Sequence, residues 1–258
     1  MPFVTCAGHA LEYEWLDAAP QDAGGLPTLV FLHEGLGSIR QWRDFPLQVV
    51  KATGCRALIY SRYGYGQSDV LREDKAGVRF MHHEALEALP ALLAALRVDR
   101  PVLVGHSDGA SIALIHAGAG HPVRAVAVMA PHVFVEPICV ESIRKAREAF
   151  SSAGLAQRLG KYHRDPAKTF HLWADAWLDP AFLAWNIEEY LPGIACPVLA
   201  LQGVDDEYGT MAQLERIRRG VRGPCELVQL AACGHAPFRD QPQATLAALT
   251  RFIGERCG

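Results

Sequence analysis

The chain has 258 residues, with 25 lysines and arginines against 28 aspartates and glutamates, and a formal net charge of −3. This length is sufficient for one α/β domain with an insertion and a large buried core. The chain has no cluster of basic residues that could follow a phosphate backbone, so no nucleic-acid partner is predicted. The longest apolar stretch, residues 88–96, is too short to cross a bilayer, so no membrane partner is predicted.

The N-terminal residues MPFVTC include no basic segment followed by an apolar one, so the chain is predicted to be cytoplasmic. Its seven cysteines form no C-x-x-C pair and no Cys/His spacing that suits zinc. Neither a metal nor an organic cofactor is predicted. The expected partner is a small-molecule substrate, and the sequence does not indicate an oligomeric state.

Strands and helices alternate along most of the chain. A hairpin is predicted at residues 3–6 and 10–16, followed by a loop at 21–27. Leucines at helical spacing predict an amphipathic helix at 81–97, bent or begun at Pro90. This alternation predicts an α/β fold, with a mostly parallel eight-stranded sheet flanked by helices. The six remaining strands are expected at 28–32, 55–60, 101–104, 123–129, 197–202 and 225–230, with further helices at 109–118 and 240–252.

The alternation stops between His132 and Leu191, where helical stretches are rich in charge and in large aromatic side chains. We therefore divide the chain into a first core part (1–131), a helical insertion (132–192) and a second core part (193–258). Aromatic side chains of the insertion either glue its helices together or line a pocket. The residues predicted to bind substrate are His33, Glu34, His132, Phe134, Trp173, Trp177 and Trp185.

Residues 102–111 read VLVGHSDGAS and place a G-x-S-x-G pattern between an apolar run and a helical pattern. This setting predicts a nucleophile elbow, in which a strand turns into a helix so sharply that the central residue is strained. Gly105 and Gly109 would let the helix and the strand pass without a Cβ clash. Ser107 is therefore the predicted nucleophile, at the carboxyl end of the sheet and beside a helix N-terminus that favours an anion.

Two further motifs follow Ser107, namely GVDDE at residues 203–207 and CGHAPF at residues 233–238. The resulting order Ser, Asp, His resembles that of the α/β-hydrolase fold, and the resemblance covers nearly all of the chain. It implies a catalytic triad of Ser107, His235 and Asp206. Asp205 and, after the preceding strand, Glu136 are the alternatives for the acid. The resemblance also implies that residues 132–192 form a cap over the carboxyl edge of the sheet.

The same resemblance implies an oxyanion hole made by the backbone N–H groups of Gly35 and Asp108. Gly35 belongs to a His-Gly loop in which Glu34 replaces the usual first glycine. The loop at 61–69, SRYGYGQSD, is similar to an R-x-x-G-x-G-x-S loop whose role in the family is mainly structural. His33 and His106 are expected to orient loops rather than to transfer protons.

The predicted function is hydrolysis of a small to medium acyl compound, most simply a carboxylic ester, through an acyl-enzyme on Ser107. A C–C bond hydrolase, a thioesterase and a lactonase use the same residues and remain alternatives. A ligand receptor of slow turnover is the alternative from another class. For Asp108 there are two interpretations. Its carboxylate either stabilises the helix N-terminus, or joins Glu34 in making the pocket mouth electronegative, which would disfavour anionic substrates.

Overall fold

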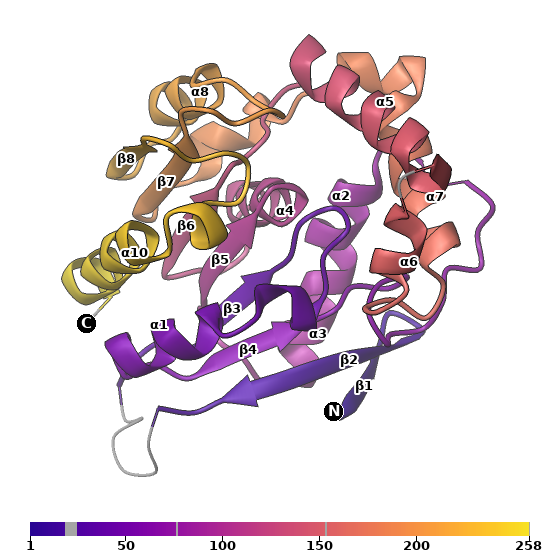
Figure 1. The fold of residues 1–258 in the computed structure, drawn as a ribbon. Coiled ribbons are helices and arrows are strands. Elements are labelled where there is room, and N and C mark those ends of the chain that lie inside the picture. Colours follow the sequence, from indigo (N-terminus) through magenta and orange to yellow (C-terminus); the bar gives the residue numbers. More distant parts are fainter. Residues whose placement is uncertain (19–24, 76, 153, 258) are drawn as a thin grey trace.

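The computed structural model describes residues 1–18, 25–75, 77–152 and 154–257, and an eight-stranded sheet is its central element (Figure 1). The strand order is β1-β2-β4-β3-β5-β6-β7-β8. β1 and β2 pair antiparallel, and β2 joins β4 antiparallel, whereas every pairing from β4 to β8 is parallel. The predicted mostly parallel α/β fold is confirmed. The strands are β1 (Phe3–Cys6), β2 (His9–Leu16), β3 (Leu29–Leu32), β4 (Ala57–Tyr60), β5 (Val102–His106), β6 (Ala125–Met129), β7 (Val198–Gly203) and β8 (Cys225–Leu230).

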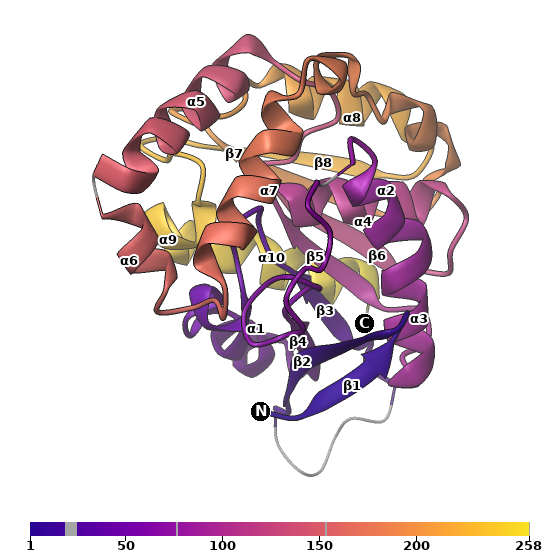
Figure 2. The same cartoon turned by 90° about the vertical axis from the view of Figure 1, so that its right-hand side faces the viewer.

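Helices cover both faces of the sheet, which explains the continuous apolar runs of its central strands (Figures 1 and 2). Successive residues of β3 point to opposite faces, so Leu29 and Phe31 enter one core while Val30 and Leu32 enter the other. The first core is closed by α1 (Phe45–Thr53) and α10 (Pro242–Cys257). The second is closed mainly by α3 (Leu89–Ala95), α4 (Asp108–Gly118) and α8 (Ala212–Gly220).

The helix predicted at 81–97 consists of three consecutive segments: α2 (Phe80–His83), a π-helical turn (Glu84–Ala88) and α3. Pro90 has no N–H to donate to the carbonyl four residues earlier, and its ring crowds that carbonyl. The wider turn directly before α3 accommodates this proline.

Helices α1 and α8 lie outside the predicted set, whereas α5 (Pro137–Ser152), α6 (Leu155–Leu159) and α7 (Pro166–Leu178) fall within the segment predicted to be helical. Before α1 and α8 the sequence gives few signals of a helix start, although α1 carries Pro46 in its first turn and ends at Gly54 with φ 75°.

The loop predicted at 21–27 falls partly on residues 21–24, which lie outside the described residues. Among the described residues, no helix is long and apolar enough to cross a membrane. The other helices are η1 (Ile39–Trp42), η3 (Pro180–Ala184), η4 (Glu188–Gly193) and α9 (Pro237–Asp240).

The insertion lies against the loops that follow β3 and β4, which is the carboxyl edge of the parallel sheet. The His163 ring accepts from the N–H of Gly66 at 2.9 Å and donates to the carbonyl of Leu36 at 3.0 Å. From α7, the Thr169 hydroxyl donates to the carbonyl of Gly64 at 2.7 Å. These three bonds tie the insertion to the edge where parallel sheets carry their sites. The boundaries at 132 and 192 remain a prediction.

Glycine is required where α4 passes over the strands. A Cβ at Gly109 would lie 2.1 Å from the carbonyl oxygen of Leu32, and one at Gly105 would lie 2.4 Å from that of Gly109. Both obstacles are backbone atoms, which cannot move without shifting β3 or α4.

We expect Gly109→Ala to lower the free energy of unfolding by about 3 kcal/mol or more, because the new methyl group overpacks a fixed backbone. Gly254→Ala is the matched control, since Gly254 lies exposed in α10 with nothing near its Cβ position. The control should gain about 0.5–1 kcal/mol from helix propensity. Urea unfolding of both variants measures the two values, and equal stability would contradict the close packing described here.

Candidate active site

Ser107 lies between β5 and α4 with φ 53° and ψ −118°, a conformation that few residues other than glycine adopt. Its backbone N–H donates to the carbonyl of Met129 at 3.0 Å, which fixes the turn against β6. The Ser107 side chain is thereby held out of the strand and above the first turn of α4. The strained, glycine-flanked turn is the local geometry that the G-x-S-x-G pattern predicts.

A chain of two hydrogen bonds joins Ser107 to a histidine and an acid. Nε2 of His235 lies 2.9 Å from the Ser107 hydroxyl oxygen, and Nδ1 lies 2.8 Å from Oδ1 of Asp206. An ionised carboxylate can only accept, so Nδ1 of His235 carries the proton and Nε2 is free to accept from Ser107. This tautomer is the one that a general base requires.

Asp206 is held in place by more than the histidine. Its Oδ1 also accepts from the N–H of Tyr208 at 2.8 Å, and its Oδ2 accepts from the Gln202 amide at 3.2 Å. Burial raises the pKa of Asp206, but the hydrogen bond and charge of His235 outweigh it, and the pKa is lowered overall. The carboxylate therefore stays ionised beside His235.

The two alternative acids lie elsewhere. Asp205 is exposed to solvent. Glu136 accepts from the Thr210 hydroxyl at 2.6 Å and from the Gln213 amide at 2.7 Å. The Glu136 carboxylate thus binds the loop before α8 and the first turn of that helix, and it does not bind His235. Of the three candidates, the structure brings Asp206 to the histidine.

The loop after β3 is organised around the carbonyl of Glu34. That oxygen accepts from the His33 ring at 2.7 Å, from the Arg62 guanidinium at 2.9 Å and from the N–H of Gly37 at 3.0 Å. In a trans peptide the following N–H points the opposite way, so the Gly35 N–H is directed away from Arg62. Within the described residues, neither this N–H nor that of Asp108 has a hydrogen-bond partner. Both are therefore free to donate to a ligand.

His33 and His106 both bridge loops, as expected of residues that orient rather than transfer protons. The His33 ring also accepts from the backbone N–H of Arg62 at 3.1 Å, and burial and the Arg62 charge keep its pKa well below the usual value. The His106 ring lies 2.7 Å from the carbonyl of His235 and 3.3 Å from the Glu34 carboxylate. It thereby connects the loop that carries His235 to the loop that carries Gly35.

Asp108 and Glu34, the two acidic residues considered for an electronegative pocket mouth, lie in different surroundings. Asp108 is only 1 % exposed, because its side chain turns into the protein beneath α7. Burial raises the pKa of Asp108 to about 6, against the opposing effects of Arg62 and the Trp177 indole. Glu34 lies beside His106 and 3.6 Å from Arg239. Burial raises its pKa, but His106 outweighs burial and the pKa falls overall, so its charge is compensated.

The aromatic residues predicted to bind substrate take different positions. His132 lies near His235, with their ring centroids 5.7 Å apart. Trp177 and Trp185 pack on Phe182 and so contribute to the packing within the insertion. Phe134 pairs with Asn186 at a β-bridge outside the sheet.

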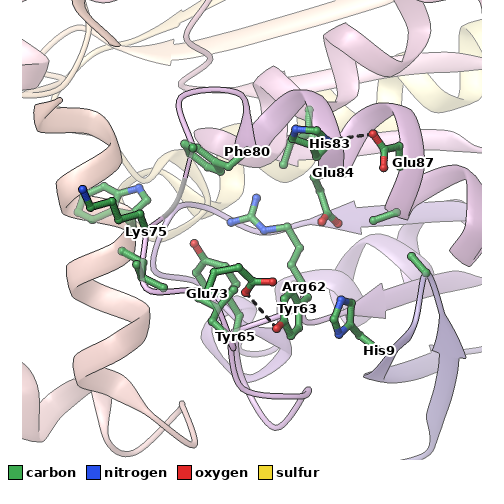
Figure 3. A pocket seen from close by; sticks show the side chains of 17 residues that line it. His9, Arg62, Tyr63, Tyr65, Glu73, Lys75, Phe80, His83, Glu84 and Glu87 are labelled. Carbon is green, nitrogen blue, oxygen red and sulfur yellow. Dashed lines mark hydrogen bonds and ion pairs between the residues drawn. The ribbon is translucent and has the colours of Figure 1, made fainter. Parts of the chain in front are cut away.

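A cavity of about 410 Å³ opens between the loop after β4, α2, the π-helical turn and α7 (Figure 3). Of the seven predicted substrate-binding residues, all of which the structure describes, Trp173 alone lines it, and Ser107, His235 and Asp206 do not. Arg62 lines this cavity although the sequence suggested only a structural role for its loop. The arginine of the SRYGYGQSD loop was the available signal, but nothing in this loop sequence indicates that the side chain faces a cavity.

Comparison with known proteins gives a consistent result. Residues 29–249 match the model of the alpha/beta hydrolase family. An enol-lactonase from Burkholderia xenovorans LB400 has a similar structure, with a TM-score of 0.77, 19 % identity, and coverage of 98 % of this chain and 100 % of that one. A structure from work on carboxylesterases of Nitrososphaera gargenis has a TM-score of 0.78, 19 % identity, and coverage of 98 % of each chain. Proline iminopeptidase of Mycobacterium smegmatis has a TM-score of 0.70, 16 % identity, and coverage of 99 % and 98 %. No curated protein sequence matches the chain.

The raised pKa of Asp108 makes stability depend on pH. Between pH about 4 and about 6 the unfolded carboxyl group ionises while the folded one keeps its proton, so the free energy of unfolding falls as pH rises. We expect a fall of about 3 kcal/mol from this group, at about 1.4 kcal/mol per pKa unit. Asp108→Asn should lack this fall, whereas Asp205→Asn at an exposed position should retain it. Denaturant unfolding at pH 4 and pH 7 gives the change in the free energy of unfolding for each protein. The same change in wild type and in Asp108→Asn would contradict the prediction.

Proposed function

Because the chain belongs to the alpha/beta hydrolase family, we propose that it is a serine hydrolase that cleaves carboxylic esters with Ser107, His235 and Asp206. The observation that carries the proposal is the continuous hydrogen-bonded chain from the Ser107 hydroxyl through His235 to Asp206, at 2.9 and 2.8 Å. Such a chain activates a hydroxyl group that is a weak nucleophile by itself.

In the proposed reaction, Nε2 of His235 takes the Ser107 proton as Oγ attacks the ester carbonyl. The tetrahedral oxyanion accepts hydrogen bonds from the N–H groups of Gly35 and Asp108, each contributing about 3 kcal/mol. Asp206 stabilises the imidazolium that forms. His235 then gives its proton to the departing alkoxide, and the C–O bond breaks to leave an acyl-enzyme. Water, deprotonated by the same histidine, attacks this ester, and His235 returns the proton to Oγ of Ser107 as the C–O bond breaks and the acid leaves.

Residues 132–192 are proposed to act as the cap of this site. Three hydrogen bonds from His163 and Thr169 attach the segment to the loops after β3 and β4. Trp173 of α7 also contacts the candidate oxyanion loop, since a Cβ at Gly35 would lie 2.1 Å from its indole nitrogen. The cap therefore sets how much room an acyl group has beside the reacting carbonyl.

Turnover of p-nitrophenyl acetate, butyrate and benzoate tests the proposal. Ser107→Ala should lower kcat/KM by at least about a thousandfold, because it removes the atom that forms the acyl-enzyme. Comparable hydrolysis by wild type and Ser107→Ala would contradict the role of Ser107. A single acylation event followed by turnover far below one per second would instead favour the ligand-receptor alternative.

Asp206→Asn should lower kcat by about a thousandfold or more, because an amide can stabilise the wrong histidine tautomer and carries no charge for the imidazolium. Asp205→Asn is the matched control, one residue away and exposed, and should keep more than half of the wild-type kcat. Steady-state kinetics of both variants on the same ester measure the two kcat values. A larger loss of kcat in Asp205→Asn than in Asp206→Asn would show that the acid has been assigned to the wrong residue.

A further inference from the structure

The cavity of about 410 Å³ lies within the size range of small-ligand sites. Its walls come from segments far apart in sequence: the turn between β1 and β2, the loop after β4, the helical segments from Phe80 to Ala88, Ile112 of α4, and α7. Most of the wall is apolar. Its apolar lining includes Tyr65, Leu71, Phe80, Ile112, Leu172 and Trp173.

Arg62 supplies a polar donor in this apolar setting. Arg62 is only 3 % exposed, and Figure 3 shows its guanidinium among the side chains that line the cavity, between Phe80, Glu84 and Tyr65. Its Nη2 donates to the carbonyl of Glu34, whereas its buried Nη1 has no hydrogen-bond partner within the described residues. A buried guanidinium donor without an acceptor is costly, so a ligand that supplies an acceptor gains from this position.

The charges around Arg62 define which acceptor suits it. Two buried carboxyl groups, Asp108 and Glu84, interact electrostatically with the guanidinium, although neither forms an ion pair with it. Glu73, Glu84 and Glu87 line the cavity, against the cationic groups of Arg62 and Lys75. Carboxyl groups therefore outnumber the cationic groups around the guanidinium. An anionic ligand would meet repulsion from these carboxyl groups, whereas a neutral oxygen takes the free N–H without adding charge.

The cavity is separated from the candidate oxyanion hole by one indole ring. Trp173 lines the cavity, and its Nε1 edge lies against Gly35 on the other side. Ile112 lines the same cavity and lies one turn beyond Asp108 on α4. The cavity thus lies next to the candidate oxyanion hole, with Trp173 between them.

Building on the proposed ester hydrolysis, we propose that this cavity binds the remote end of the acyl group, and that Arg62 selects an uncharged aryl or alkyl group bearing a carbonyl or similar acceptor oxygen. Arg62 is then a specificity-determining residue, and Trp173 is the wall past which the acyl chain runs. The preferred substrates are neutral oxygenated aryl-alkanoyl esters.

Three p-nitrophenyl 3-arylpropanoates test the proposal: the 4-acetylphenyl ester, the nearly isosteric 4-isopropylphenyl ester and the 4-carboxyphenyl ester, with p-nitrophenyl acetate as the short reference. For wild type, kcat/KM for the ketone should exceed that for the isopropyl compound by at least about tenfold, as expected for a hydrogen bond to a buried charged donor. The carboxylate should be the poorest of the three. In Arg62→Met, the ratio of ketone to isopropyl should fall to about one.

Ala88→Leu narrows the cavity without changing Arg62 and should lower kcat/KM for all three arylpropanoates at least about tenfold relative to the acetate. Ala94→Leu, exposed on α3 and outside the cavity, is its control and should leave these ratios unchanged. An unaltered ketone-to-isopropyl ratio in Arg62→Met, a preference for the carboxylate, or equal effects of Ala88→Leu on acetate and arylpropanoates would overturn the proposal.

A binding measurement separates this proposal from the proposed function. Titration of Ser107→Ala with 4-ethylacetophenone in a calorimeter should show binding, and adding Arg62→Met should weaken it at least about tenfold. If no ester is hydrolysed but the ketone binds in this Arg62-dependent way, the ester hydrolysis is wrong and the cavity assignment holds. If esters are hydrolysed through Ser107 but the ketone does not bind, the cavity assignment is wrong.

Discussion

The close approach of α4 to the sheet is the constraint on which the rest of the site depends. The Cβ positions of Gly105 and Gly109 are occupied by backbone atoms, so α4 can begin directly behind β5 only with glycine at both places. Ser107 is consequently held at φ 53°, with its side chain above the carboxyl edge of the sheet. The strain belongs to one residue, and two buried cores, one on each face of the sheet, keep the flanking strand and helix in place.

Hydrogen bonds connect the turn at Ser107 to the loops that carry Glu34 and His235. His106, the residue before Ser107, contacts the carbonyl of His235 and the carboxylate of Glu34. The Glu34 carbonyl in turn accepts hydrogen bonds from His33, Arg62 and Gly37. Glu34 replaces the glycine usual at this point of the loop, and its carboxylate is engaged by His106 and Arg239. Glu34 thus adds a connection between the loop carrying His235 and the loop carrying Gly35.

The sequence allowed the fold and the proposed catalytic residues to be predicted because both leave short, local patterns. Apolar runs mark the strands, and Ser107, Asp206 and His235 each follow a strand within a recognisable motif. The cavity left no such pattern. Its wall combines residues from the β1–β2 turn to α7, and whether Arg62 faces it depends on tertiary packing. The same limit applies to Asp108, whose position after the nucleophile gave no sign that α7 buries it.

The central claim is that Ser107 forms a covalent intermediate with help from His235, and reaction with an alkyl fluorophosphonate tests it most directly. The Ser107 oxygen attacks phosphorus, fluoride leaves and His235 takes the proton, so mass spectrometry of the digested protein reads the site of attachment. We expect one adduct, on the peptide containing Ser107, absent from Ser107→Ala and formed at least about a hundredfold more slowly by His235→Gln. Labelling at another residue, or labelling at Ser107 that is as fast without His235, would contradict the account.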